Sequence, residues 1–186
     1  GDGGAASATG DGGAASATGD GGAASATAPR GSASATGYRG AASATGYGGA
    51  ASATGDWGAA SATGPGGAAL ATGRRGAASA TGYGGAALAT SYGGAALATG
   101  YMGAALATGE ESTVGSAASG TCVLMARSGY WIVRRGAVLL QSWQDGDAHP
   151  YRVFDSIALG LEDGEKVAIV AGELRRATAA PDRSQP

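Results

Sequence analysis

Three residues near the C-terminus carry the side chains that metal binding or acid–base chemistry would need. Asp145, Asp147 and His149 lie in one short segment, and carboxylate and imidazole groups hold cations or move protons. His149 is the only histidine of the chain, and no second cluster of such residues supplies the remaining ligands. A polar loop between two strands is the better interpretation of this segment. The sequence therefore predicts no catalytic group, no metal site and no cofactor.

Four aspartates near the N-terminus raise the question of calcium, because some nonapeptide repeats bind this ion. Those repeats place an aspartate at the entry to each strand, in the pattern Gly-Gly-x-Gly-x-Asp. Here Asp2, Asp11, Asp20 and Asp56 lie earlier, in the turn, and recur irregularly. A calcium column is therefore not expected. Cys122 has no second cysteine to pair with, and its apolar neighbours predict a core position.

The element that must position every other side chain is a nonapeptide, Gly-x-x-Gly-Ala-Ala-Ser-Ala-Thr. It runs twelve times without a gap from Gly1 to Thr108. Positions two and three vary freely, position seven is Ser or Leu, and positions six and eight are always Ala. Two glycines in nine residues disfavour a helix by about 1 kcal/mol each, and collagen needs glycine at every third position. The pattern predicts a five-residue strand and a Gly-x-x-Gly turn, stacked into a β-solenoid.

One nonapeptide is too short to close a coil alone. We expect two per coil, which makes six coils; three intertwined chains that each supply one nonapeptide per level are the alternative. Side chains alternate along a strand, so positions six and eight face inward and positions five, seven and nine face outward. The opposite assignment stays open, because exchange of Ser for Leu also fits a core that widens toward one end.

Three sets of outward side chains are candidate binding residues. An exposed aliphatic column is typical of an interface, and with two nonapeptides per coil three of the four leucines share one column. The threonines form a candidate ladder for ice or another ligand, and the turn-tip aromatic residues bind a ligand or pack at the edge. The interface set is Leu70, Leu88, Leu97 and Leu106; the ladder is Thr9, Thr18, Thr27, Thr36, Thr45, Thr54, Thr63 and Thr72; the turn tips are Tyr38, Tyr47, Trp57, Tyr83, Tyr92 and Tyr101.

Composition changes after the repeat. Five apolar runs follow, separated by turn signals such as Asp163-Gly164, and these indicate short strands. The expected organisation is a solenoid over 1–108, a degenerate coil or cap over 109–120, a small β-rich domain over 121–176 and a flexible tail over 177–186. The predicted fold class is all-β, a β-solenoid followed by a small antiparallel β domain.

Charge and hydropathy narrow the range of partners. The 12 basic and 14 acidic residues give a net charge of -2, which offers no electrostatic basis for nucleic-acid binding. No run approaches the roughly 18 apolar residues of a membrane span, and the N-terminus lacks the regions of a signal peptide. Gly1 already lies in register with the repeat, which predicts a processed form or a fragment of a longer array.

The uninterrupted Ala-Ser-Ala-Thr-Gly strings resemble the repeat arrays of trimeric autotransporter adhesins on bacterial surfaces. They are also similar to bacterial and phage solenoid proteins in which such strings precede a small β domain. The resemblance covers residues 1 to about 120, and the chain lacks the larger inward aliphatic residues of the adhesin heads. It implies a self-associating structural protein, the rigid shaft of a surface fibre, phage appendage or filament, located outside the cell, on its surface or on a virion.

A second resemblance implies a different function. Ser-Ala-Thr in register is similar to the Thr-x-Thr ladders of hyperactive antifreeze solenoids, although Leu replaces Ser in four copies. The Gly, Ala and Ser bias is also similar to silk as a physical analogy. The alternative function is therefore an ice- or glycan-binding solenoid that uses its Ser and Thr ladders.

Overall fold

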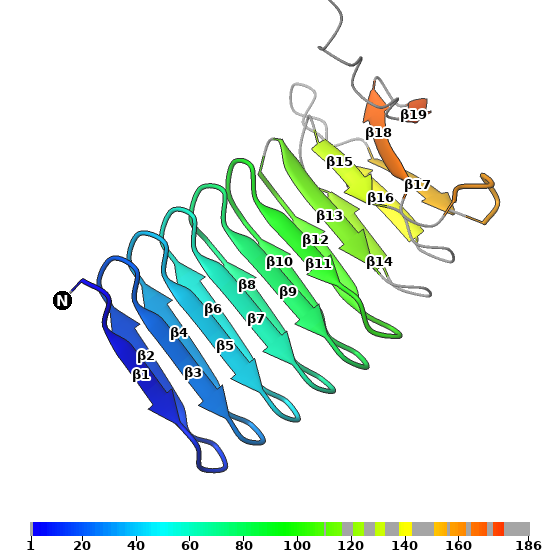
Figure 1. Ribbon diagram of the computed structural model, residues 1–186. Helices are drawn as coiled ribbons and strands as arrows, with labels where there is room; N and C mark the ends of the chain where they lie inside the picture. Colours follow the sequence, from blue (N-terminus) through cyan, green and yellow to red (C-terminus); the bar gives the residue numbers. More distant parts are fainter. Residues whose placement is uncertain are drawn as a thin grey trace, which may run out of the picture.

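The protein is described from a computed structural model, which places residues 2–109, 111–116, 121–124, 129–132, 138–142, 151–155, 157–162, 165–170 and 173–176. Over the repeat it is a parallel β-solenoid in which each nonapeptide contributes one strand (Figure 1). Successive nonapeptides alternate between two sheets, A and B, so each strand pairs with the strand 18 residues further on. A single chain therefore closes each coil with two nonapeptides, which confirms the expected coil length.

The strands of each sheet follow in chain order along the solenoid. Sheet A holds β1 Ala5–Ala8, β3 Ala23–Thr27, β5 Ala41–Thr45, β7 Ala59–Thr63, β9 Ala77–Thr81, β11 Ala95–Ala98, β13 Ser112–Ser116, β15 Gly129–Ile132, β18 Lys166–Val170 and β19 Glu173–Arg176. Sheet B holds β2 Ala14–Thr18, β4 Ser32–Thr36, β6 Ala50–Thr54, β8 Ala68–Ala71, β10 Ala86–Ala89, β12 Ala104–Ala107, β14 Thr121–Leu124, β16 Val138–Ser142 and β17 Tyr151–Asp155.

Alanine methyl groups from both sheets make up the core of the repeat. From β2 to β12, the alanines at positions six and eight are at most 5% exposed, while positions five and seven are half-buried or exposed. This alternation confirms that positions six and eight face inward and rules out the opposite assignment. The core is narrow because each row contributes only methyl groups, and in the coils around Ala44, Ala53 and Ala62 it excludes solvent completely.

The turns are ordered in the same way as the strands. Within each turn the N–H of the position-four glycine donates to the carbonyl at position one, as from Gly13 to Gly10 at 2.8 Å. Position three has a positive φ, which together with a negative φ before it defines a type II turn, and this type favours proline at position two. Pro29 and Pro65 occupy that position.

Hydrogen bonds also join each turn to the equivalent turn one coil further on. The N–H at position three donates to the carbonyl at position two of that next turn, as from Trp57 to Arg74 at 2.8 Å. Close stacking explains the glycine at position one. A Cβ at Gly64, whose φ is 135°, would lie 2.4 Å from the carbonyl oxygen of Gly46 in the preceding coil.

Parallel pairing continues beyond the repeat. β13 pairs with β11 and β14 pairs with β12, and the same ladders run on to β15 and β16. From Ala104↔Thr121 onward the offset between paired residues is 17, and Val114 and Ser112 are fully buried at inward positions. The sequence placed the change of architecture at 109–120, whereas antiparallel pairing begins only at β17 and β18. That residues 121–176 fold separately stays a prediction.

The antiparallel strands complete the all-β fold that the sequence predicts. β17 pairs with β16, β18 pairs with β15, and β19 pairs with β18. They lie beyond the last parallel strand of each sheet and cover its edge (Figure 1). Within the described ranges no helix has the length and apolarity to cross a membrane.

Candidate binding surfaces

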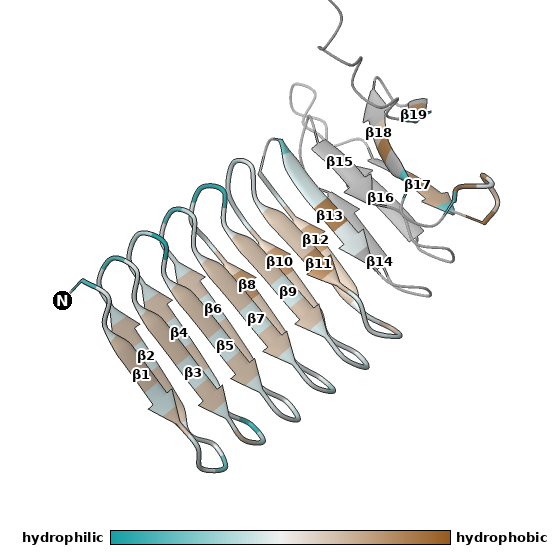
Figure 2. Ribbon diagram, in the orientation of Figure 1, coloured by the Kyte–Doolittle hydropathy of each residue, from teal (hydrophilic) through white to brown (hydrophobic). Residues whose placement is uncertain are grey.

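An apolar column runs along the outer face of sheet B. Leu88 is in register with Leu70 on one side and Leu106 on the other, so three of the four leucines stack, as expected from two nonapeptides per coil. The register continues the column through Val123 and Leu140 to Val153, and Figure 2 shows hydrophobic colour on the strands that carry the leucines. The remaining leucine, Leu97, lies on sheet A next to Ser79 and is 37% exposed.

A shallow groove of about 680 Å³ accompanies the Leu column. It spans β4 to β12 and is lined by the alanines beside the column together with Ser32, Ser34 and Ser52. Every outward strand position in this stretch is Ala, Ser, Thr or Leu, so the face carries no charge. Its shape is a raised row of leucines beside a flat row of alanines.

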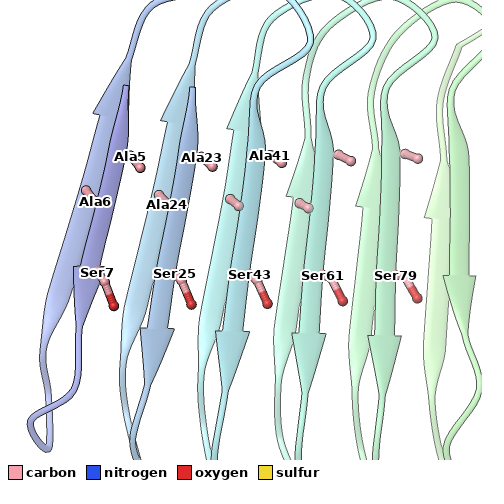
Figure 3. A pocket seen from close by; sticks show the side chains of 14 residues that line it. Ala5, Ala6, Ser7, Ala23, Ala24, Ser25, Ala41, Ser43, Ser61 and Ser79 are labelled. Atoms are coloured by element: carbon pink, nitrogen blue, oxygen red, sulfur yellow. The ribbon is translucent and has the colours of Figure 1, made fainter. Parts of the chain in front are cut away.

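Sheet A presents hydroxyl groups where sheet B presents leucine. Ser7, Ser25, Ser43, Ser61 and Ser79 follow one another in register on five successive strands, and their side chains point away from the core (Figure 3). A groove of about 610 Å³ lies over these strands. Because three of the four leucines lie on sheet B, the serine column of sheet A is unbroken over half the solenoid.

The structure divides the candidate threonine ladder between the two sheets. Thr27, Thr45 and Thr63 are in register beside the serine column of sheet A, followed by Thr81. The other sheet holds Thr18, Thr36 and Thr54, while Thr9 and Thr72 lie just beyond their strands. All eight threonines are exposed or half-buried. The strands with Leu at position seven all end one residue before their threonine: β8, β10, β11 and β12.

Turn tips form two ridges along opposite edges of the solenoid (Figure 1). Ridge A consists of positions two and three of the turns that lead into sheet A, and ridge B of the same positions in the turns that lead into sheet B. The candidate aromatic residues are divided between them. Ridge A carries Tyr38, Trp57 and Tyr92, whereas ridge B carries Tyr47, Tyr83 and Tyr101; their exposed fractions range from 38% to 68%.

Ridge B is mainly an aromatic edge. The rings of Tyr83 and Tyr101 stack with centroids 5.8 Å apart, and the Tyr83 hydroxyl donates to Sδ of Met102 at 3.1 Å. Tyr47 is 68% exposed. Toward the N-terminus, an exposed ion pair joins Arg30 and Asp11 at 3.2 Å. Edge packing therefore accounts for the contacts of Tyr83 and Tyr101.

Ridge A combines aromatic rings with guanidinium groups. The Arg39 guanidinium lies 5.1 Å from the centre of the Tyr38 ring, and that of Arg75 lies 4.9 Å from the Trp57 ring one coil away. Such cation–π contacts stabilise by about 0.5–1 kcal/mol at exposed sites. The sequence analysis named the aromatic residues but missed the arginines, because their proximity depends on a coil of two nonapeptides.

Carboxylates on ridge A are engaged by other groups of the same ridge. Oδ1 of Asp20 accepts a hydrogen bond from the N–H of Tyr38 at 3.1 Å, and Oδ1 of Asp56 accepts one from the N–H of Arg74 at 2.9 Å. At the C-terminal end of the ridge, the hydrogen bond to Glu111 raises the pKa of Tyr92, with desolvation and the negative charge of Glu111 adding to the effect.

Several position-three residues occupy a backbone conformation that favours glycine. Arg39, Trp57 and Arg75 have φ between 55° and 63°, as have residues of similar φ elsewhere in the turns: Arg30, Met102 and Glu111. The left-handed conformation costs a residue with a Cβ about 1–2 kcal/mol. Glycine stands at this position in most other copies, with φ near 68°. Three successive coils of ridge A therefore keep a large side chain where glycine would be less strained.

The acid–base candidates contribute nothing to these surfaces. Asp145, Asp147 and His149 lie outside the described residues, and within the described part no group of three His, Cys, Asp or Glu side chains is placed to hold a metal ion. Comparison with protein-family models, curated proteins and solved structures finds no match to this chain. The likeness to adhesin and antifreeze repeats thus remains a resemblance of sequence pattern.

Proposed function

We propose that this chain is a non-enzymatic structural protein, the rigid shaft of a surface fibre, phage appendage or self-assembling filament. In this proposal the strands after the repeat cap or attach the shaft, which is located outside the cell, on its surface or on a virion. The observation that carries the proposal is the unbroken in-register ladder. Strands and turns are both hydrogen-bonded from coil to coil, so bending requires breaking bonds in two sheets and two ridges at once.

The ladder gives the shaft a defined length. Eight strands of each sheet stack in parallel, from β1 to β15 and from β2 to β16. With about 4.8 Å between neighbouring strands, the parallel part extends for about 35 Å. Because each added pair of nonapeptides extends the rod by one further step, the repeat suits a spacer.

The outer face of sheet B supports lateral assembly with a second copy of this chain. The Leu column stands beside a row of alanines, and the face carries no charge that would repel a copy of itself. A twofold axis would seat the leucines of each copy against the alanines of the other, in the face-to-face packing of two aligned sheets. The exposed apolar surface then becomes buried.

Replacing Leu70, Leu88 and Leu106 together by serine tests this interface. Serine is the residue of most other copies, so the fold is expected to persist, while association weakens at least about 100-fold through the loss of buried aliphatic surface. Sedimentation velocity over a range of concentrations measures the change. Leu97→Ser, on the opposite sheet, is the matched control and is expected to associate like the parent. A parent that stays monomeric at every concentration contradicts lateral assembly.

A second candidate function has its own observation. The unbroken serine column of sheet A, with threonines beside it, forms a flat array of hydroxyl groups that fits an ice- or glycan-binding face. Sequence alone suggested testing Thr54 and Thr72, but Thr54 pairs within sheet B and Thr72 follows a strand of that sheet.

Tyrosine substitution at Thr45 and Thr63 tests the hydroxyl face, because a bulky ring there disrupts its flatness. Thermal hysteresis is expected to fall by most of its value in this variant and to remain in Thr54→Tyr, the matched change on sheet B. A parent without thermal hysteresis removes the ice-binding function and leaves the glycan version to a separate binding assay.

A further inference from the structure

Three successive coils of ridge A carry large side chains at the strained third turn position. Arg39, Trp57 and Arg75 all have positive φ, whereas Gly3, Gly21 and Gly93 occupy the same position in the flanking coils. Glycine is therefore compatible with this ridge. The side chains of the central coils add exposed functional groups that the turn itself does not require.

The central part of ridge A is locally cationic. Arg39, Arg74 and Arg75 place three guanidinium groups on two turns, and among the described residues none of them forms an ion pair with a carboxylate. The one carboxylate between them, on Asp56, accepts a hydrogen bond from the backbone N–H of Arg74. Planar guanidinium groups bind carboxylates through two parallel hydrogen bonds.

Aromatic faces lie beside these cations. Trp57 is 50% exposed and Tyr38 is 43% exposed, and each has a guanidinium within about 5 Å of its ring centre. Hydrogen bonds between turns hold the backbone of the ridge in place, from Arg39 to Asp56 at 2.9 Å and from Arg75 to Tyr92 at 2.8 Å. The ridge is thus a preorganised row of rings and cations that repeats at the coil spacing of about 4.8 Å.

We propose that ridge A between Tyr38 and Tyr92 binds an acidic polysaccharide whose chain runs along the solenoid axis. Sugar rings pack on the exposed aromatic faces, and uronate carboxylates bind the guanidinium groups. An extended polymer suits an open edge because it gathers many shallow contacts over successive coils. A nucleic acid is disfavoured, because its binding depends on a broad positive field and this chain has a net charge of -2. This site is separate from both sheet faces.

The test compares binding of an oligogalacturonate with binding of its fully methyl-esterified form, measured by isothermal titration calorimetry on the full chain. The parent is expected to bind the acid at least 10-fold more tightly than the ester, with affinity that falls as salt is added. Arg39→Gly combined with Arg75→Gly is expected to lose at least 10-fold. Arg30→Gly makes the same change on ridge B and is expected to bind like the parent.

Folding is monitored separately from binding. Because glycine relieves the strain of positive φ, the double variant is expected to melt at or above the temperature of the parent; if it does not fold, the two single variants are compared instead. The proposal is overturned if the parent does not bind the oligogalacturonate or binds the ester equally well. It is also overturned if the Arg30 control loses as much affinity, or if single-stranded oligothymidine binds more tightly.

Discussion

Replacing Ala62 by leucine is expected to destabilise the solenoid by about 3 kcal/mol or more, whereas Ser61→Leu is expected to change stability by less than about 1 kcal/mol. The two substitutions introduce the same side chain at adjacent residues. Ala62 faces inward and is fully buried, while Ser61 faces outward at a position where other copies carry leucine. Equilibrium unfolding in denaturant measures both free energies.

The large effect at Ala62 follows from how the two sheets are held together. Ala44 and Ala80, its partners in the neighbouring strands, are also fully buried. A leucine needs the sheets to separate locally, but the same strands are hydrogen-bonded to coils on both sides, so the strain spreads along the ladder. Equal free energies for the two variants would mean that the sheets are not closely packed.

Gly64→Ala is expected to cost about 2–3 kcal/mol, measured by the same unfolding experiment. The new Cβ would lie 2.4 Å from the carbonyl oxygen of Gly46, and alanine is strained at the φ of 135°. Relief requires the turn to change conformation. Ala28 occupies the same turn position two coils earlier and is not among the residues of positive φ, so the fold does have an alternative, and this limits the size of the effect.

Gly10→Ala is the matched control, because Gly10 begins the first turn of the same column. A Cβ there meets no atom within 4 Å, so the change in stability is expected to be below about 0.5 kcal/mol. If both variants unfold at the same denaturant concentration, close stacking of the turns is not what selects glycine at this position.

Most of the repeat could be predicted from its sequence, because one rule applies in every copy. Invariant alanines at alternate positions predict the inward face, and two glycines bracketing variable residues predict the turn. The coil of two nonapeptides was chosen over three intertwined chains on the length needed to close a coil, and the register of Ser25 with Ser43 confirms it. The expected strand Lys166–Val170 also has the observed bounds.

The continuation beyond Thr108 could not be predicted, because the features that carry the pattern disappear there. Positions such as Val114 take the inward place of alanine, and the offset between paired strands falls to 17. Runs of apolar residues do not show which side faces inward. Parallel and antiparallel pairing are then equally compatible with the sequence, and the expected domain boundary was placed too early for the pairing that is observed.

The candidate surfaces were partly predicted. Stacking of Leu70, Leu88 and Leu106 follows from counting coils, and the register shows it. The cation–π partners on ridge A did not follow from inspection of single copies. Arg75 and Trp57 are 18 residues apart, and only the closed coil places them together.

Alternation of successive nonapeptides between two sheets imposes a parity rule on changes in repeat number. Gain or loss of two nonapeptides shortens or lengthens the rod and leaves every later residue on its original face. Gain or loss of one exchanges the faces of everything that follows, so that a deletion after Thr54 would place Leu70 and its neighbours in line with the serines of sheet A. Arrays of this kind are therefore free to vary in length by whole coils, while each surface chemistry is inherited only through even steps.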